Sequence, residues 1–233
     1  GFGPAGSSPL VAAFTHARKP FGQALAFSLD KGRTWTLHDG GTHVVPNQGL
    51  EEGERDPKLF WHPPTRRWIM ALWVQKNQVR FFTSRSLKEW SHASDFCGDG
   101  FYECPDLFPL SVDGNPQEQR WVLLDAAFRY WIGSFDGTRF VADTGPMRGD
   151  FGANFYAAQT WSNTEPRVVQ IGWMNGGEYP GMPFNQQMSF PCELALRTTA
   201  EGIRLCRMPV VEIERLRVGS DAVLDRLLNG GEE

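Results

Sequence analysis

The chain has 233 residues, a length that fits one large all-β domain or two small domains. Apolar residues make up 41% of it, enough for a core, and its aromatic residues include 9 Trp and 17 Phe. The net charge of −4 argues against a nucleic acid or an anionic membrane as partner. No apolar stretch approaches the ~20 residues that a membrane-spanning helix needs.

Short apolar runs separated by turn residues fill most of the chain, and helical periodicity is nearly absent until its end. This pattern predicts an all-β fold. The C-terminal residues 210–228 are expected either to form a short helix or to begin a connection to a further domain. The expected strands, in chain order, are 10–14, 24–28, 56–61, 68–74, 79–84, 106–110, 121–125, 130–134, 155–161, 168–174, 188–196 and 202–207.

Three turn segments, 27–35, 83–90 and 133–140, resemble one another. Each combines a small hydroxyl residue, a tight turn and then an aromatic residue, so the polar side chains are expected to satisfy backbone groups in the bend. The first also matches the S-x-D-x-G-x-T-W "Asp box" of sialidase-like propellers. We expect its acid, Asp30, to organise the turn rather than to catalyse.

The chain also repeats on a longer scale. Segments that begin at Asp56, at Glu103 and near Asn154 recur at intervals of 47 and 51 residues. Four-stranded repeats of this period favour propeller blades, and the alternative is a β-sandwich with accidental spacing.

A carboxylate opens two of these segments. Asp56 precedes an apolar run in Arg55-Asp56-Pro57-Lys58-Leu59-Phe60, and Glu103 does so in Glu103-Cys104-Pro105-Asp106-Leu107-Phe108. If the segments are repeats, the two acids sit at equivalent places and can converge on one pocket. Two carboxylates that face one pocket are the basic equipment of glycoside hydrolysis.

These motifs resemble two of the three signatures of glycoside hydrolase family 32, which contains invertases, inulinases and levanases. The resemblance continues through Phe155-Tyr156-Ala157-Ala158-Gln159-Thr160-Trp161 and Ile171-Gly172-Trp173-Met174. It extends into Met188-Ser189-Phe190-Pro191-Cys192-Glu193-Leu194, where Cys192 replaces the arginine of the family's Pro-Arg-Glu-Leu pattern. Each motif alone is weak, whereas all of them in this order are specific.

The resemblance implies an incomplete five-bladed β-propeller, with about three whole blades and part of another. Residues 1–212 would form the partial catalytic propeller, and 213–233 a linker or tail toward a β-sandwich domain outside this sequence. The family's Trp-x-Asn-Asp-Pro-Asn-Gly motif, whose Asp is the nucleophile, does not occur. Trp173-Met174-Asn175-Gly176 shares only its first letters, so we expect no nucleophile in this chain and little or no activity from it alone.

By the same resemblance, Glu103 is the general acid/base and Asp56 stabilises the transition state while holding sugar hydroxyls. Proton donation near neutral pH requires a raised pKa, so we expect one for Glu103. Arg55 either positions substrate or forms an ordinary ion pair. Tyr179 is a candidate for the rim of the substrate pocket. Asp106 either tunes Glu103 electrostatically or plays a turn or surface role.

The remaining chemistry-bearing residues predict no cofactor and no catalytic metal, because the five histidines lack metal-type spacing. Cys104 is expected to be a buried neighbour rather than a nucleophile. The cysteines form no C-x-x-C pair, which favours free buried thiols and leaves one disulfide possible. The cysteines are Cys97, Cys104, Cys192 and Cys206.

The expected function is therefore hydrolysis of a fructosyl bond, with retention, in fructans or sucrose-like carbohydrates. The alternatives are a non-catalytic carbohydrate-binding propeller, a related arabinanase or xylosidase, and a sialidase-like or structural propeller. Exposed blade edges would favour self-association. The resemblance implies a secreted or periplasmic location, although the sequence shows no signal peptide.

Overall fold

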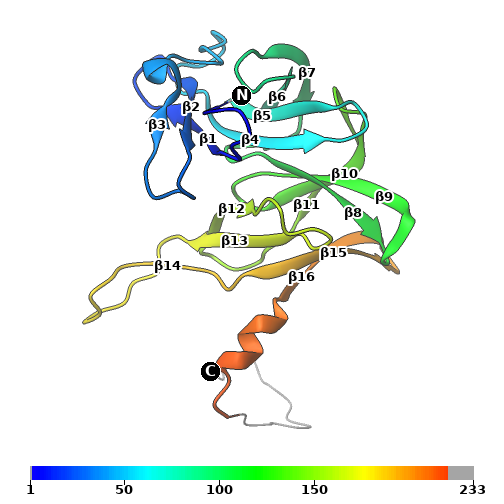
Figure 1. Cartoon of the computed structure of the whole chain (residues 1–233). Coiled ribbons are helices and arrows are strands. Elements are labelled where there is room, and N and C mark those ends of the chain that lie inside the picture. The colour runs from blue at the N-terminus through cyan, green and yellow to red at the C-terminus, as the bar shows by residue number, and fades with distance from the viewer. Residues whose placement is uncertain (1, 220–233) are drawn as a thin grey trace.

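The computed structural model describes residues 2–219. These residues form three sheets and two short 3-10 helices, η1 (His38–Gly41) and η2 (Val211–Leu216). Figure 1 shows the sheets stacked face to face, with the two N-terminal sheets above the third and η2 leaving from below. Neither helix within residues 2–219 is long and apolar enough to cross a membrane.

The first two sheets are simple antiparallel meanders, in which each strand pairs with the next along the chain. Sheet one consists of β1 (Leu10–His16), β2 (Gly22–Ser28) and β3 (Thr36–Leu37). Sheet two consists of β4 (Arg55–His62), β5 (Arg67–Gln75), β6 (Gln78–Ser84) and β7 (Ser91–Cys97).

The third sheet contains two such units, which a single parallel pair, Leu196 with Val112, joins. The first unit consists of β8 (Asp106–Val112), β9 (Asn115–Leu124), β10 (Arg129–Phe135) and β11 (Phe140–Arg148). The second consists of β12 (Phe155–Thr160), β13 (Val169–Met174), β14 (Gln187–Met188), β15 (Cys192–Thr199) and β16 (Gly202–Pro209).

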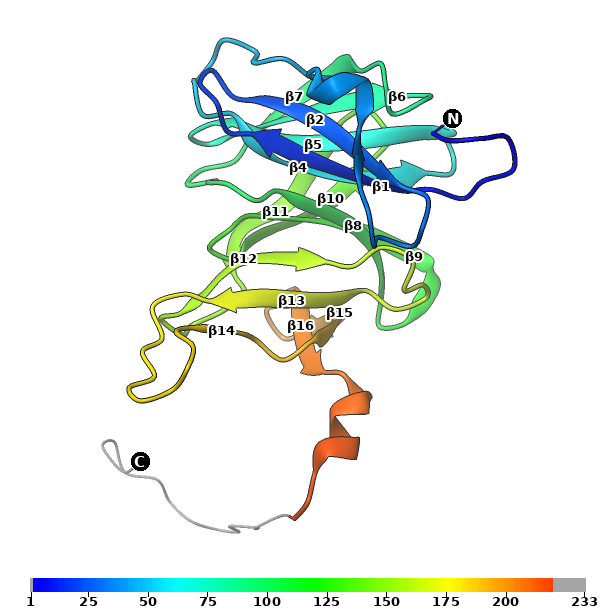
Figure 2. The same cartoon turned by 60° about the vertical axis from the view of Figure 1, so that its left-hand side comes forward.

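The four units are successive blades of an incomplete propeller, as the repeats predict, and the family resemblance implies five blades in the whole ring. The sheets do not close into a ring. In Figure 2 the strands β4, β8 and β12 begin on the same side of the molecule. Loops that precede these strands can therefore build a common site at that side.

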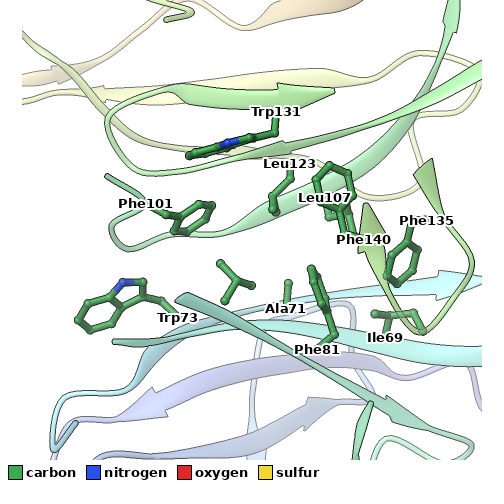
Figure 3. Close-up of a cluster of buried hydrophobic side chains, with 11 residues drawn as sticks. Ile69, Ala71, Trp73, Phe81, Phe101, Leu107, Leu123, Trp131, Phe135 and Phe140 are labelled. Carbon is green, nitrogen blue, oxygen red and sulfur yellow. The ribbon is translucent and has the colours of Figure 1, made fainter. Parts of the chain in front are cut away.

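The core lies between blades. One cluster joins the β4–β7 sheet to the β8–β11 unit, and Figure 3 shows its side chains filling the space between them. A second joins the β8–β11 unit to the β12–β16 unit. The side chains from Ile69 to Val74 are all buried, because β5 has neighbours on both faces of its sheet, and the run is accordingly apolar without alternation.

All twelve expected strand regions are strands, and their ends agree within about three residues, except that β9 begins at Asn115 instead of residue 121. The expectation for 188–196 is wrong in one respect: the structure breaks this run into β14 and β15 around Pro191, which lacks the N–H that a ladder needs. Strands β3, β7 and β11 are exposed or half-buried along most of their length and lack a continuous apolar run, so the sequence did not predict them. The helix η2 begins the C-terminal segment, whereas the rest of the expected tail, 220–233, lies outside the described residues.

The repeated turns organise themselves as the sequence predicts. Asp30 accepts hydrogen bonds from Thr34 N at 2.9 Å and from Thr34 Oγ1 at 2.7 Å, while Ser28 Oγ accepts one from Gly32 N at 2.8 Å. The two bonds from Thr34, chiefly the one from its amide, together with a bond from the Ser28 hydroxyl, lower the pKa of Asp30 to about 2. In the third turn Asp136 accepts hydrogen bonds from two backbone amides. Asp30 is thus a turn organiser, far along the chain from the paired acids.

Candidate active site

The starts of three inner strands share one backbone distortion. The pairing of β4 with β5 and that of β12 with β13 each leave one extra residue on the inner strand, which is a β-bulge. Asp56 and Ala157 lie in these bulges with left-handed φ angles of 65° and 50°. Cys104, just before β8, has a φ of 43°. These three residues therefore occupy equivalent positions in successive blades.

This equivalence corrects the repeat by one residue. Because Pro57 and Pro105 align, Asp56 corresponds to Cys104, and Glu103 corresponds to Arg55. The expectation that the two acids occupy equivalent positions is wrong. They nevertheless meet, since Glu103 contacts the residue that precedes Asp56.

Arg55 joins the two carboxylates. Its Nε donates a hydrogen bond to Glu103 Oε1 at 3.1 Å, its Nη2 contacts the same oxygen, and its Nε lies 4.0 Å from Asp56 Oδ2. Nη1 donates to Gly53 O at 2.6 Å. The guanidinium also lies over the buried ring of Trp73, 4.2 Å from its centroid. These contacts fix the guanidinium in one orientation beside both acids.

Glu103 has two further polar neighbours. Tyr156 Oη donates a hydrogen bond to Glu103 Oε2 at 2.5 Å, and Tyr102 Oη accepts one from Arg55 Nη2 at 3.2 Å. Arg55, Glu103 and Tyr156 occupy equivalent positions in three blades and form one hydrogen-bonded row. The Glu103 side chain retains 19% of its exposure, so solvent still reaches it.

Asp56 is fixed from both sides. Its amide donates a hydrogen bond to Thr15 Oγ1 at 3.0 Å, and its Oδ2 accepts one from Cys104 N at 3.0 Å. An open pocket of about 320 Å³ lies against this carboxylate. Residues from all four blades line it: Ala13, Phe14, Thr15, Asp56, Pro57, Cys104, Ala157 and Gln159.

The two acids have opposite pKa shifts. Burial raises the pKa of Asp56, and the Cys104 amide and Arg55 only partly offset it. Burial also acts to raise the pKa of Glu103, but the hydrogen bonds from Tyr156 and Arg55 outweigh it and lower the pKa overall. The expectation of a raised pKa for Glu103 is therefore wrong, because the surrounding hydrogen-bond donors stabilise its charged form.

The contacts of Cys104 and Asp106 indicate structural roles for both residues. Burial, followed by the nearby Asp56 charge, raises the pKa of the Cys104 thiol, which leaves it protonated and unreactive at neutral pH. Asp106 is fully buried and accepts a hydrogen bond from Thr160 N at 2.6 Å, while its Oδ1 lies 3.2 Å from Lys58 Nζ. It joins blades together and does not reach the pocket.

Tyr179 is the one expected site residue that the structure does not bring to this cluster. It lies in the loop between β13 and β14, which Figure 1 shows projecting from the sheets, and its ring packs on Phe184 at 5.5 Å. Trp173 is closer. It pairs with Tyr156 across β12 and β13, keeps 37% exposure, and donates from Nε1 to Gln186 at 2.6 Å. The sequence signal for Trp173 is its cross-strand register with Tyr156.

The four cysteines are free, as the spacing favours, but none is fully buried: Cys97 is exposed, and Cys104, Cys192 and Cys206 are half-buried. Within residues 2–219, no group of three or more His, Cys, Asp or Glu side chains could hold a metal ion. The described site brings together two carboxylates, a guanidinium and a phenol.

Comparison with known proteins identifies relatives that cover most of this chain. Residues 6–209 match the family model described as "Glycosyl hydrolases family 32 N-terminal domain". The levanase of Bacillus subtilis (strain 168) is 38% identical over 243 residues, which cover 93% of this chain and 36% of the levanase. An extracellular exo-inulinase of Aspergillus niger is 31% identical over 258 residues, 90% of this chain and 48% of its own length.

Solved structures agree in fold. Exo-inulinase from Aspergillus awamori superposes with a TM-score of 0.78 at 29% identity, over 89% of this chain and 50% of that one. A β-fructofuranosidase from Schwanniomyces occidentalis, complexed with fructosyl-erythritol, gives the same score and identity over 90% and 46%. The chain thus spans about half, or less, of these relatives. It belongs to glycosyl hydrolase family 32, and its residues 6–209 correspond to the N-terminal domain of that family.

Proposed function

We propose that this chain supplies the acid/base and the sugar-binding carboxylate of a retaining β-fructofuranosidase-type hydrolase that acts on fructans or sucrose-like substrates. The observation that carries the proposal is Arg55, which holds Glu103 and Asp56 in one cluster at the edge of an open pocket. Named relatives are levanases, exo-inulinases and an invertase.

Asp56 is the residue proposed to hold the fructosyl ring. It lines the pocket, and the Cys104 amide and Thr15 hydroxyl fix its position. A carboxylate that accepts two sugar hydroxyls accelerates hydrolysis only where those bonds strengthen in the transition state. Arg55 is proposed to orient both acids. It does so through ion pairs with Glu103 and Asp56, and by fixing these acids it also positions the substrate.

Glu103 is proposed as the general acid/base. Its lowered pKa means that the unliganded site holds it ionised. To donate a proton, it must gain one when substrate removes water from the site or when another carboxylate lies nearby, since both raise the pKa of an acid. Retaining hydrolysis needs such a second carboxylate at about 5 Å. We propose that this nucleophile is not part of the present sequence, which lacks the family's Asp-Pro-Asn-Gly motif.

Two measurements on the purified chain test this function. Binding of fructosyl-erythritol, followed by calorimetry, should weaken at least tenfold in Asp56→Asn, about 1.4 kcal/mol. Fructose release from levan, inulin and sucrose should be slow or undetectable. Unchanged binding in Asp56→Asn would remove the proposed role of this carboxylate. Robust release that disappears in Glu103→Gln would instead show that the chain contains its own nucleophile.

The second candidate is a non-catalytic carbohydrate-binding propeller. The ionised Glu103, held by Arg55 and Tyr156, favours it, because a carboxylate so stabilised is a poor proton donor. Equal sugar affinity in the wild type and Glu103→Gln, with no turnover when the rest of the enzyme is supplied, would support it. The family match leaves the arabinanase-like and sialidase-like readings without support.

We further propose that the parent protein acts outside the cell, as the name of the extracellular exo-inulinase relative indicates. Detection of the protein in the medium or periplasm, rather than in the cytoplasmic fraction, tests this location.

Self-association is proposed through the edge of β1, which within the described residues pairs with β2 alone. Light scattering should give a mass above that of one chain, and a purely monomeric species would contradict association. The propeller is proposed to end at residue 212, and a fragment that ends there should remain folded by circular dichroism if this boundary is right.

A further inference from the structure

A second open pocket, of about 410 Å³, adjoins the candidate site along the chain. Residues 13–15 of β1 line the Asp56 pocket, and the residues that follow, His16, Arg18 and Lys19, line the second one together with His43 and Pro46. Nothing in the proposed hydrolysis uses these basic side chains. They gather at the turn between β1 and β2 and at the segment that pairs with Gln23.

The charge of this pocket is only partly neutralised. Lys19 pairs with Glu52 at 3.2 Å, but both side chains are about 70% exposed, and exposed pairs contribute little. Arg18 makes no ion pair within residues 2–219. Its guanidinium, with five donors in a planar fork, is the side chain best suited to an oxyanion.

Two imidazoles complete the donor set. His16 Nδ1 and His43 Nε2 lie 3.0 Å apart, so one ring donates a hydrogen bond to the other. In the tautomer in which His43 donates, His16 carries its own proton on Nε2, which has no hydrogen-bond partner among the described residues. The pair therefore offers an N–H donor in the pocket that Arg18 also lines.

The position of His43 is built into the fold. A Cβ at residue 22 would lie 2.2 Å from His43 Nδ1, so the glycine there leaves the room that the ring occupies. The backbone next to it is fixed, since Val44 N and Val45 N both donate to Gln23 O. Two histidines without a third ligand do not make a metal site.

We propose that this pocket binds a tetrahedral oxyanion, either free phosphate or the phosphate monoester of a sugar. Arg18 supplies the charge-assisted fork, and the histidine pair supplies a preorganised N–H. The inference goes beyond the proposed hydrolysis, because it assigns a second ligand group to the neighbouring residues of β1 and its turn.

Titration of the full chain with inorganic phosphate tests the site, with binding followed by calorimetry and by NMR signals of the histidine rings. Saturable binding should weaken at least tenfold, about 1.4 kcal/mol, in Arg18→Ala. His43→Gln should weaken it less. Arg85→Ala, which removes an exposed arginine on the turn after β6, is the matched control and should bind as the wild type does. Equal phosphate affinity in Arg18→Ala and the wild type, or no saturable binding, would overturn the proposal.

Titration with fructose 6-phosphate distinguishes the two sources of the oxyanion. Fructose 6-phosphate that binds more tightly than phosphate and depends on both Arg18 and Asp56 supports a sugar phosphate spanning both pockets. Binding that depends on Arg18 alone supports free phosphate. Failure of the hydrolase proposal has a different signature, in which phosphate binding persists while fructosyl-erythritol does not bind.

Discussion

Two clusters of polar side chains cross the same three blades within a few residues of each other, yet their surroundings differ. The rim cluster consists of Arg55, Glu103 and Tyr156. The deep cluster consists of Lys58, Asp106 and Thr160. The rim cluster keeps contact with solvent, whereas the Asp106 side chain has no exposure and that of Lys58 only 10%.

The difference shows how one repeat provides both a candidate active site and a set of contacts that hold the blades together. In the deep cluster Lys58 Nζ donates to Thr160 O at 2.6 Å and to Thr160 Oγ1 at 3.1 Å, so the ammonium has partners in two blades. Because these groups are buried from solvent, exchanging their present partners for a ligand would be costly. The rim cluster can exchange Tyr156 or Arg55 for substrate or water. Chemistry is therefore expected at the rim, and stability from the deep cluster.

The largest expected effect follows from breaking the deep pair. Asp106→Ala leaves the Lys58 ammonium buried without its counter-charge, so the free energy of unfolding should fall by about 3–5 kcal/mol. Urea denaturation measures it. Glu52→Ala, which breaks the exposed pair with Lys19, is the control and should cost less than about 1 kcal/mol.

Replacement of both partners sharpens the result. Lys58→Met combined with Asp106→Leu removes the uncompensated charge together with its partner, so it should recover much of the lost stability. Equal losses in the single and double variants would show that the pair itself, rather than the stranded charge, stabilises the propeller.

A smaller effect is expected from Thr160→Val. This change removes one of the acceptors of Lys58 and keeps the shape of the side chain, as well as the Thr160 carbonyl and amide. A lost hydrogen bond to a charged group costs about 1.5 kcal/mol. Thermal unfolding should show this loss without a change in sugar binding. Weaker sugar binding would mean that the deep cluster reaches the pocket after all.

Sequence reasoning found the strands and the paired acids because both leave local signals. The apolar run of β5 and the turn at Asp30 follow directly from residue order. The charges of Asp56 and Glu103 suggest a register that is one residue too early, because the backbone instead aligns the prolines that follow them. The shift in Glu103 pKa depends on Tyr156, 53 residues away, and no local pattern predicts such a contact.

The smallest change in stability is expected at the rim. Tyr156→Phe removes the hydrogen bond to Glu103 Oε2, but Arg55 and water remain as partners, so the loss near pH 7 should be below about 1 kcal/mol. Because that bond favours the charged carboxylate, its loss should raise the pKa of Glu103 toward the ordinary range. Carbon-detected NMR titration of the Glu103 carboxyl measures the change.

The sign of the pH dependence follows from the lowered pKa. A carboxyl whose folded pKa lies below its unfolded pKa stabilises the fold above the unfolded value, and this stabilisation is lost as the pH falls through the folded one. Tyr156→Phe should therefore lose less stability on acidification than the wild type does. Tyr130→Phe is the control. The Tyr130 hydroxyl accepts a hydrogen bond from Leu205 N, so its removal should leave the pKa of Glu103 unchanged. If Tyr156→Phe also leaves the pKa of Glu103 unchanged, the Tyr156 hydroxyl does not influence the charge of Glu103, and the ion pair with Arg55 accounts for it.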